Sequence, residues 1–374
     1  MNDNLKIYIA LIIIFLFLFS SFFYLKFFSK KNEYREGFKF SELKAPIILS
    51  YEKKYDEKPN SSLSFGPGYK YEVRWTVEQV YVYWGGSIEI WIKNVGDNRL
   101  FLYGFGILVD EKLYSKNTGL YLGSNEVYLG ILGFESPEKE GNYTYTLKFS
   151  ILAEGKKGWY DYGMVGEQKN NLTVMQLGKK VNYENKKNVA YYYDKVKNLL
   201  KNRDLSVKSK AQELASKYPG SYNTHQIAEV FGYVKKEIKY IREREGRDYW
   251  AKPHETIALG AGDCEDQALL LSALLIEIGA NVRFHITKDH AFISVYFGKD
   301  TTLLNGLDKY YETNLTYSWF EDKFGIWVTA DPTSSIYLGS LPGDSEPVAK
   351  TKGGAKGVWE LTNTTVLYDI DVRV

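Results

Sequence analysis

The residue with the clearest chemical potential in this sequence is Cys264, the single cysteine of the 374-residue chain. It lies in the segment GAGDCEDQ (residues 260–267), directly before the apolar run ALLLSALLIEIGA. Asp263 occupies the position of a helix N-cap and Asp266 follows three residues later, so we expect Cys264 to be the first residue of a buried helix. There the positive end of the helix dipole favours the thiolate, which is the reactive form of cysteine.

Cysteine chemistry also needs a base that takes the thiol proton and a partner that holds this base in place. The alternating residues 281–287 predict one strand, and His290 begins a second alternating segment. A third such segment, residues 325–333, carries Asp331 near its end, directly before a proline. We therefore expect Cys264, His290 and Asp331 to supply the nucleophile, the base and the orienting carboxylate.

The surrounding segment resembles the core of the transglutaminase-like cysteine enzyme superfamily, which is related to papain-like proteases. It is most similar to the prokaryotic membrane-anchored branch with peptidases and amidases. The resemblance extends from about Tyr183 to Tyr337 and rests on these motifs: DYW (248–250), Pro253, ET (255–256), GAGDCED (260–266), HAF (290–292) and DPT (331–333). Phe292 departs from the pattern, since many members carry Trp after His-Ala.

The resemblance implies an α+β fold in which the cysteine helix and further helices pack on an antiparallel sheet. It implies Cys264 as the nucleophile, His290 as general base and acid, and Asp331 as the residue that orients the imidazole. The alternative interpretations are structural: Cys264 as a buried core residue and Asp331 as a cap of the turn at Pro332.

Acyl transfer also requires stabilisation of an oxyanion. The backbone N–H of Cys264 is the favoured donor, and Trp250 and Gln267 are further candidates. We interpret Glu265 and Asp266 as structural acids that cap the helix or pair with basic residues, and that oppose the thiolate. No metal and no cofactor are expected, because the other histidines lack metal-ligand spacing: His225, His254 and His285.

An uncharged apolar segment, Ile7 to Leu25, is long enough to cross a bilayer as a helix. No small-residue cleavage site follows it, which favours an uncleaved transmembrane anchor. The lysines and the arginine after this segment place the body in the cytoplasm by the positive-inside rule. We nevertheless expect an extracellular body on a single-pass membrane protein, because a β-sandwich and five possible glycosylation sites are predicted: Asn60, Asn142, Asn171, Asn314 and Asn363.

Composition and local sequence patterns indicate several folded parts. The chain is 44% hydrophobic and 25% charged, which excludes a disordered chain, and its net charge of +2 gives no basic field for nucleic acid. About seven alternating segments with glycine-rich turns predict an immunoglobulin-like β-sandwich, and helical periodicity follows it. The expected parts are an anchor (1–30), a tether (31–67), the sandwich (68–178), the catalytic domain (179–345) and C-terminal strands (346–374), for which the sequence predicts no packing partner.

The first functional hypothesis is a membrane-anchored thiol enzyme that attacks amide or isopeptide bonds of a protein or peptide, with the cell envelope as one possible source. Hydrolysis by a peptidase or amidase is favoured, since it needs no second substrate site, and cross-linking transamidation is the alternative among enzymes. A hypothesis from another class is a catalytically silent surface protein, whose sandwich engages a partner in the cell envelope.

Overall fold

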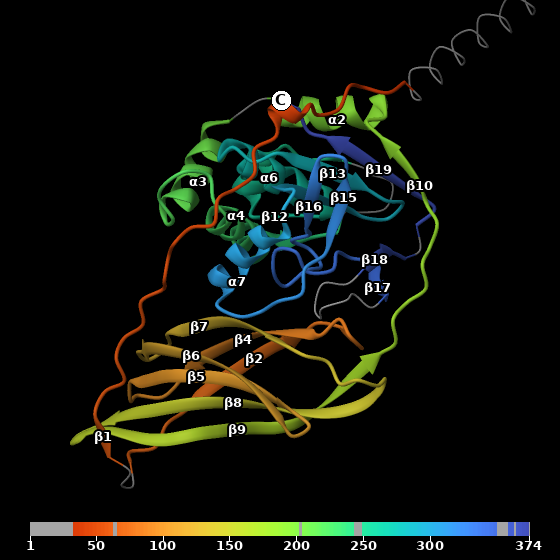
Figure 1. The fold of residues 1–374 in the computed structure, drawn as a ribbon. Coiled ribbons are helices and arrows are strands. Elements are labelled where there is room, and N and C mark those ends of the chain that lie inside the picture. The colour runs from red at the N-terminus through yellow and green to blue at the C-terminus, as the bar shows by residue number, and fades with distance from the viewer. Residues whose placement is uncertain are drawn as a thin grey trace, which may run out of the picture.

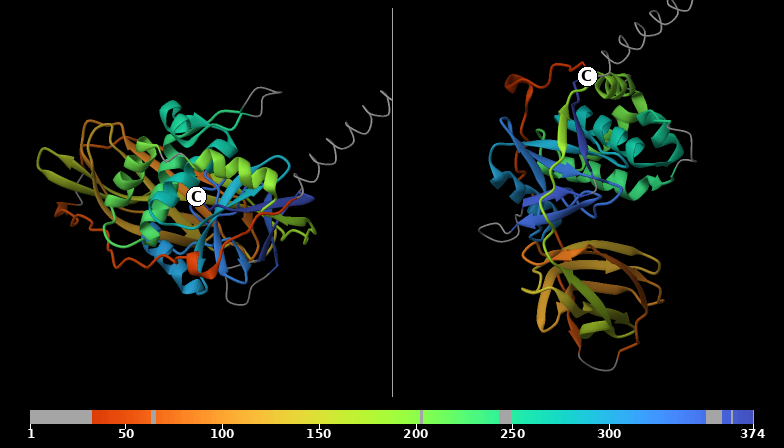
Figure 2. Two further views of the ribbon diagram at one scale, coloured as in Figure 1. Left: turned by 90° about the horizontal axis from the view of Figure 1, so that it is seen from above. Right: turned by 90° about the vertical axis from the view of Figure 1, so that its right-hand side faces the viewer.

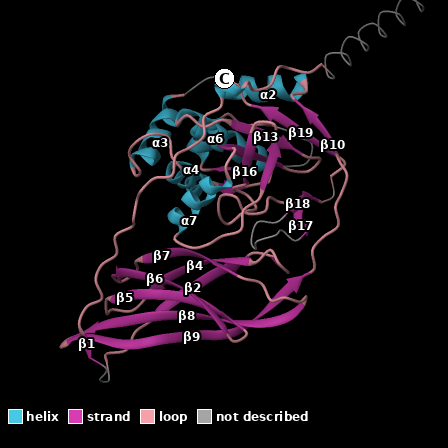
Figure 3. Cartoon of the chain, in the orientation of Figure 1, coloured by secondary structure: helices cyan, strands magenta, loops and turns pink. Residues whose placement is uncertain are grey.

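The computed structural model describes residues 33–62, 66–201, 204–242, 249–349, 358–362 and 364–373. The predicted anchor, Ile7 to Leu25, lies outside these residues. Within them, no helix combines the length and the apolar character that a membrane crossing requires. The described chain has a mixed α/β fold, with a part built only of strands and a part in which helices cover a sheet (Figures 1 and 3).

The all-strand part consists of two sheets that face one another across an apolar core. A three-stranded antiparallel sheet has the order β2-β4-β7. The larger sheet has the order β1-β9-β8-β5-β6, with β3 also paired to β9. The strand bounds are β1 (Ser61–Ser62), β2 (Tyr71–Val77), β3 (Val80–Tyr81), β4 (Gly86–Asn94), β5 (Leu100–Val109), β6 (Lys112–Leu122), β7 (Val127–Phe134), β8 (Gly141–Gly155) and β9 (Gly158–Met175).

Alternation explains how these two sheets pack. In β4, Ile88, Ile90 and Ile92 are at most 1% exposed, and they meet Phe105 and Phe149 of the larger sheet in one core cluster. Successive residues of a strand point to opposite faces of the sheet, so each sheet presents one apolar face to the other.

The second part contains the α-helices of the described chain and a six-stranded sheet in the order β10-β19-β13-β14-β16-β15. All neighbours in this sheet are antiparallel except β10 and β19. The helices are α2 (Ala190–Lys201), α3 (Leu205–Ser216), α4 (Thr224–Glu237), α5 (Pro253–Leu259), α6 (Cys264–Glu277) and α7 (Asn305–Tyr311). The strands are β10 (Glu184–Lys187), β13 (Val282–Ile286), β14 (Ala291–Gly298), β15 (Trp319–Asp322), β16 (Gly325–Ala330) and β19 (Val366–Asp371).

Four shorter strands and two 3-10 turns complete the described elements. The parallel pair β11 (Lys239–Tyr240) and β12 (Ala261–Gly262) lies directly before α6, and β17 (Ser345–Ala349) pairs with β18 (Val358–Leu361). The 3-10 turns are η1 (Phe40–Glu42) and η2 (Thr301–Leu304).

The C-terminal segment supplies a central strand of this sheet. The sequence left the packing of residues 346–374 open, whereas β19 lies between β10 and β13. Arg283 of β13 pairs with Asp371 of β19, and Phe284 pairs with Ile370. The sheet that carries the candidate site therefore includes a strand that begins 21 residues after the predicted end of the catalytic domain at 345.

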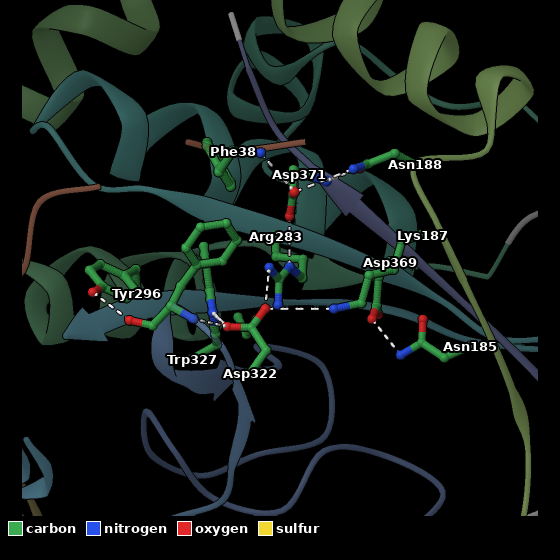
Figure 4. Close-up of polar contacts among 12 residues, drawn as sticks. Phe38, Asn185, Lys187, Asn188, Arg283, Tyr296, Asp322, Trp327, Asp369 and Asp371 are labelled. Atoms are coloured by element: carbon green, nitrogen blue, oxygen red, sulfur yellow. Dashed lines mark hydrogen bonds and ion pairs between the residues drawn. The ribbon is translucent and has the colours of Figure 1, made fainter. Parts of the chain in front are cut away.

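The two faces of this sheet differ in chemistry. Val282, Phe284 and Ile293 pack with the apolar side chains of α6 in the largest core cluster. On the opposite face, Arg283 donates to Asp371 at 2.8 Å and to Asp322 at 3.0 Å, as Figure 4 shows. Buried ions of this kind are stable only when they are paired and hydrogen-bonded.

The segment predicted as a tether packs along the helical part before it reaches the strands. It begins near the C-terminus, in the red and orange trace of Figures 1 and 2. The backbone N–H of Phe38 donates to Asp371 at 3.0 Å, Ile47 forms a bridge with Asn223, and Tyr55 donates to Glu312 at 2.6 Å. These contacts join segments more than 170 residues apart.

Candidate active site

Cys264 lies at the first position of α6, as the sequence predicted. Asp263 is the N-cap, and its carboxylate accepts the backbone N–H of Asp266 at 3.4 Å. The helix that follows is apolar and mostly buried, and it packs against β13 and β14. A helix held in this way fixes the direction of its first side chain. The thiol is half-buried.

Sheet pairing brings His290 and Asp331 to the same edge. His290 directly precedes β14 and Asp331 directly follows β16, and these neighbouring antiparallel strands pair Ile293 with Ala330. His290 Nε2 lies 2.6 Å from Asp331 Oδ2. The Cys264 thiol and the His290 side chain lie close enough for each to shift the pKa of the other. Since Nε2 faces the carboxylate, Nδ1 is the ring nitrogen left for the thiol.

The Asp331 carboxylate is fully buried and is held by the turn that follows it. Its Oδ1 accepts from the Thr333 hydroxyl at 2.7 Å and from the backbone N–H groups of Thr333 and Ser334 at 3.1 and 3.3 Å. Its Oδ2 accepts from the backbone N–H of Gly343 at 2.8 Å, beside His290. Asp331 therefore also caps the turn, as the alternative interpretation predicted. Its Oδ1 caps the turn, and its Oδ2 faces His290.

Charge complementarity sets the ionisation of this pair. Burial acts to lower the pKa of His290, but the Asp331 carboxylate and the nearby Cys264 thiol outweigh it and raise the pKa to about 10. Burial acts to raise the pKa of Asp331, and the imidazole and the turn donors reverse this effect and hold it below its ordinary value. The arrangement thus favours an imidazolium–carboxylate pair at neutral pH.

The structure corrects the expectation that Cys264 has a lowered pKa at the helix start. Burial raises the pKa of the thiol, His290 acts to lower it, and Glu265 raises it further. The thiol donates to Glu265 Oε2 at 3.0 Å. Glu265 was interpreted as a capping or ion-pairing acid, and here it is a direct partner of the thiol, so its opposition to the thiolate is stronger than expected.

Asp266 also differs from its predicted role in a capping box. Its Oδ1 accepts the backbone N–H of Ala251 at 2.7 Å, which fastens the segment that contains Trp250 to the start of α6. A Cβ on Gly262 would lie 2.6 Å from the Cβ of Asp266, so only glycine allows this approach. Asp266 therefore links the GAGDCED motif to the segment that follows DYW.

The two side chains considered as oxyanion donors have different surroundings. Gln267 Nε2 donates to the carbonyl of Gly262 at 3.2 Å and lies 3.5 Å from that of Ile238, so its amide is directed into the backbone. Trp250 is 8% exposed, and Lys195 Nζ lies 3.7 Å from its ring centroid. The backbone N–H of Cys264 belongs to the first helical turn, whose N–H groups have no intrahelical acceptor. It is the donor that the geometry favours.

A second His–Asp pair lies on the far face of the sheet, which the sequence reasoning did not anticipate. His285 Nδ1 lies 2.6 Å from Asp369, and its Nε2 lies 2.7 Å from the Ser294 hydroxyl. All three are at most 4% exposed, so substrate cannot reach them. The ring of Phe292 stacks between His285 and His290, with centroid distances of 4.9 and 5.9 Å. The alternation in residues 282–286 could have indicated this second pair, because it directs His285 to the face of the sheet opposite to that of Phe284.

N-glycosylation requires an asparagine at the protein surface. All four asparagines that the structure describes are exposed: Asn60, Asn142, Asn171 and Asn314. Asn363 lies outside the described residues. Glycosylation itself stays a prediction.

Comparison with known families identifies the segment that holds the site. Residues 208–332 match the family described as the Transglutaminase-like superfamily. The match contains Cys264, His290 and Asp331. A comparison with curated proteins gives no match.

Solved structures with partial similarity come from several organisms. The CARDB domain of a Pyrococcus furiosus protein is 16% identical, with a TM-score of 0.22, over 30% of this chain and 99% of that domain. A candidate protease from Parabacteroides distasonis is 9% identical, with a TM-score of 0.24, over 58% of this chain and 63% of that one. AggA, the major subunit of aggregative adherence fimbriae type I from Escherichia coli, is 13% identical, with a TM-score of 0.19, over 30% and 100%.

The superfamily comprises cysteine-type enzymes, and its match coincides with the helices and strands that position the thiol, the imidazole and the carboxylate. Residues 208–332 of this chain therefore form a transglutaminase-like domain.

Proposed function

We propose that this protein is a thiol enzyme that cleaves amide bonds by hydrolysis. The observation that supports this proposal is the place of the Cys264 thiol beside His290, whose Nε2 lies 2.6 Å from the Asp331 carboxylate. This arrangement supplies a nucleophile, a base and an orienting group. An exclusively structural role would not require a half-buried thiol near an imidazole at the start of a rigid helix.

The first half of the reaction forms a thioester. The thiolate sulfur of Cys264 attacks the carbonyl carbon of the amide, and its oxygen becomes an oxyanion near the backbone N–H of Cys264. The imidazolium of His290 then donates its Nδ1 proton to the leaving amine as the carbon–nitrogen bond breaks. Asp331 holds the Nε2 proton throughout, so that Nδ1 keeps facing the sulfur.

The second half regenerates the enzyme. His290 Nδ1, now unprotonated, accepts a proton from water, and the resulting hydroxide attacks the thioester carbonyl. The carbon–sulfur bond breaks, the carboxylic acid leaves, and the imidazolium faces the thiolate again. An amine in place of water would give transamidation by the same steps. We assign hydrolysis because it needs no second substrate site.

The test uses the full-length protein in detergent with a library of peptides that contain backbone and side-chain amides. We expect mass spectrometry to detect acid products with the wild type and none with Cys264→Ala. Addition of a primary alkylamine at a concentration far below that of water separates the two outcomes, because an amide product shows that the enzyme selects an amine as the acyl acceptor. Products that form equally with Cys264→Ala would overturn the proposal.

We further propose that Ile7 to Leu25 anchors the protein in a membrane and that its body is extracellular. The apolar segment and the sequons support this topology, while the charges that flank the segment oppose it. Protease treatment of intact cells is the test. Digestion of the body before lysis is the expected result, and full protection until lysis would place the body inside.

A further inference from the structure

A cavity of about 230 Å³ lies between the strand-built part and the helical part, away from Cys264, His290 and Asp331. Its walls come from β4, β6 and β7 on one side and from α4 and α7 on the other, with the segment around Tyr51 along the rim. Figure 1 shows α7 directly above β7. Sites for small molecules form preferentially at such boundaries between structural units.

Two ion pairs across this boundary neutralise part of the charge in the cavity. Lys116 of β6 lies 3.1 Å from Glu312 and donates to the carbonyl of Tyr311 at 2.7 Å. Lys235 of α4 lies 3.6 Å from Glu89 of β4. These pairs account for both carboxylates that line the cavity.

Three more lysines line the cavity and leave it positively charged: Lys53, Lys236 and Lys309. All three residues are exposed, although burial acts to lower the pKa of Lys236. Among the described residues, Lys236 and Lys309 have no ion-pair partner within 4 Å. Three ammonium groups around a concave surface raise the local concentration of anions.

Two buried polar atoms on the cavity wall have no hydrogen-bond partner among the described residues: Glu89 Oε1 and His225 Nε2. Both side chains are only 1% exposed. The other ring nitrogen of His225 lies 3.4 Å from the Thr224 hydroxyl, which leaves Nε2 for the cavity. Buried polar groups in native proteins are nearly always satisfied, so these two atoms call for a ligand group.

Aromatic rings hold His225 in this position. The rings of Tyr51, Tyr218 and Tyr310 surround it with centroid distances of 5.8, 5.1 and 5.5 Å. Burial and the nearby Lys309 lower the pKa of His225 to about 4, so the imidazole is neutral at pH 7. A neutral Nε2 exchanges a hydrogen bond with a hydroxyl group, whichever tautomer is present.

We propose that this cavity binds a small hydroxylated anion, in which a phosphate or carboxylate group contacts the lysines and a hydroxyl group contacts Glu89 and His225. Lysine ammonium groups bind either anion as point charges, and a hydroxyl group can donate to the free carboxylate oxygen. The volume lies below the usual range of 300–1,000 Å³ for drug-sized ligands, which restricts the ligand to a few heavy atoms beyond the anionic group.

The test is titration calorimetry on the full-length protein in detergent, with glycerol 3-phosphate, glycerate, inorganic phosphate and glycerol as probes. We expect saturable one-to-one binding of glycerol 3-phosphate or glycerate that weakens with salt, weaker binding of phosphate, and none of glycerol. The first two probes distinguish a phosphate from a carboxylate ligand. Absence of saturable binding by every anion would show a cavity that holds water only and would overturn the proposal.

Variants locate the binding. Lys309→Gln should weaken glycerol 3-phosphate or glycerate at least about fivefold, while Lys208→Gln, an exposed control on α3, should leave it unchanged. His225→Phe keeps the ring and removes its nitrogens, so it should abolish the preference over inorganic phosphate. Equal effects of both lysine variants, or an unchanged preference in His225→Phe, would overturn the assignment. Cys264→Ala should bind as the wild type does, which separates this proposal from the proposed catalysis.

Discussion

Replacement of Asp331 by Asn removes the charge that sustains the His290 imidazolium. The amide oxygen of Asn can still accept from Thr333 and Ser334, but its NH₂ group then faces Gly343 N–H and His290 Nε2. Two donors cannot pair, so Nε2 must lose its proton and the remaining ring proton moves to Nδ1. A neutral imidazole that carries its proton on Nδ1 no longer places a full positive charge beside the sulfur, so the thiolate loses this stabilisation.

The magnitude follows from the pKa of His290. With a pKa of about 10, roughly 99% of the wild type carries an imidazolium at pH 8, against about 3% at the ordinary value of 6.5. Loss of a positive charge beside the thiol raises the pKa of a cysteine by about 1–3 units. We therefore expect alkylation of Cys264 at pH 8 to become about 10- to 1,000-fold slower in Asp331→Asn.

The assay is the rate of iodoacetamide labelling over a pH series, read by intact mass, and Cys264 is the only thiol that can react. In the wild type the rate should rise into the alkaline range, because burial and Glu265 raise the pKa of Cys264. Asp344→Asn, an exposed change in the same loop, is the matched control. Equal pH–rate profiles for Asp331→Asn and the wild type would refute this reasoning.

Stability gives an independent readout of the same substitution. The pKa of His290 is raised in the folded state, so its contribution is complete below the unfolded value near 6.5 and is lost as the pH rises through about 10. The pKa of Asp331 is lowered, so its contribution is lost as the pH falls through the folded value. The difference in Tm between the wild type and Asp331→Asn should be largest between about pH 4 and 6.5.

Three further substitutions test separate parts of the site. Glu265→Gln should lower the pKa of Cys264 and speed its alkylation at pH 7, and an unchanged profile would exclude the carboxylate as a restraint on the thiol. Gly343→Ala places a methyl group 3.2 Å from His290 Nε2 and 2.7 Å from a serine hydroxyl, so alkylation should slow about tenfold or more, with stability reduced by about 1–3 kcal/mol in chemical denaturation. Arg283→Met removes the cation that is paired with the buried Asp371 and one of the two cations near Asp322, so it should destabilise the fold by about 3–5 kcal/mol in the same assay; a loss below 1 kcal/mol would contradict the role of this network.

Local signals in the sequence were sufficient for the elements that carry the proposed triad. An N-cap aspartate before an apolar run predicted the start of α6 at Cys264, and the structure confirms it. Alternation predicted the strands beside His290 and Asp331, which are β14 and β16. These features depend on neighbours within a few residues, which is the range over which capping and periodicity act.

Features that depend on distant pairing could not be predicted in this way. The place of β19 in the central sheet depends on pairing between residues almost 90 positions apart, such as Arg283 and Asp371. The contact of Asp266 with Ala251 and the turn donor Gly343 likewise arise only when the chain is folded. The predicted lowering of the Cys264 pKa left out burial and the contact with Glu265, which both raise it, and burial cannot be read from local sequence.

The central claim is that Cys264 becomes acylated with the help of His290. The most direct measurement is the reaction of the full-length protein with p-nitrophenyl acetate, followed by absorbance and by peptide mapping. We predict a burst of one nitrophenolate per chain, with the acetyl group on Cys264, and no burst in Cys264→Ala or His290→Gln. A wild type without a burst, acetylation elsewhere in the chain, or an undiminished burst in His290→Gln would contradict the account.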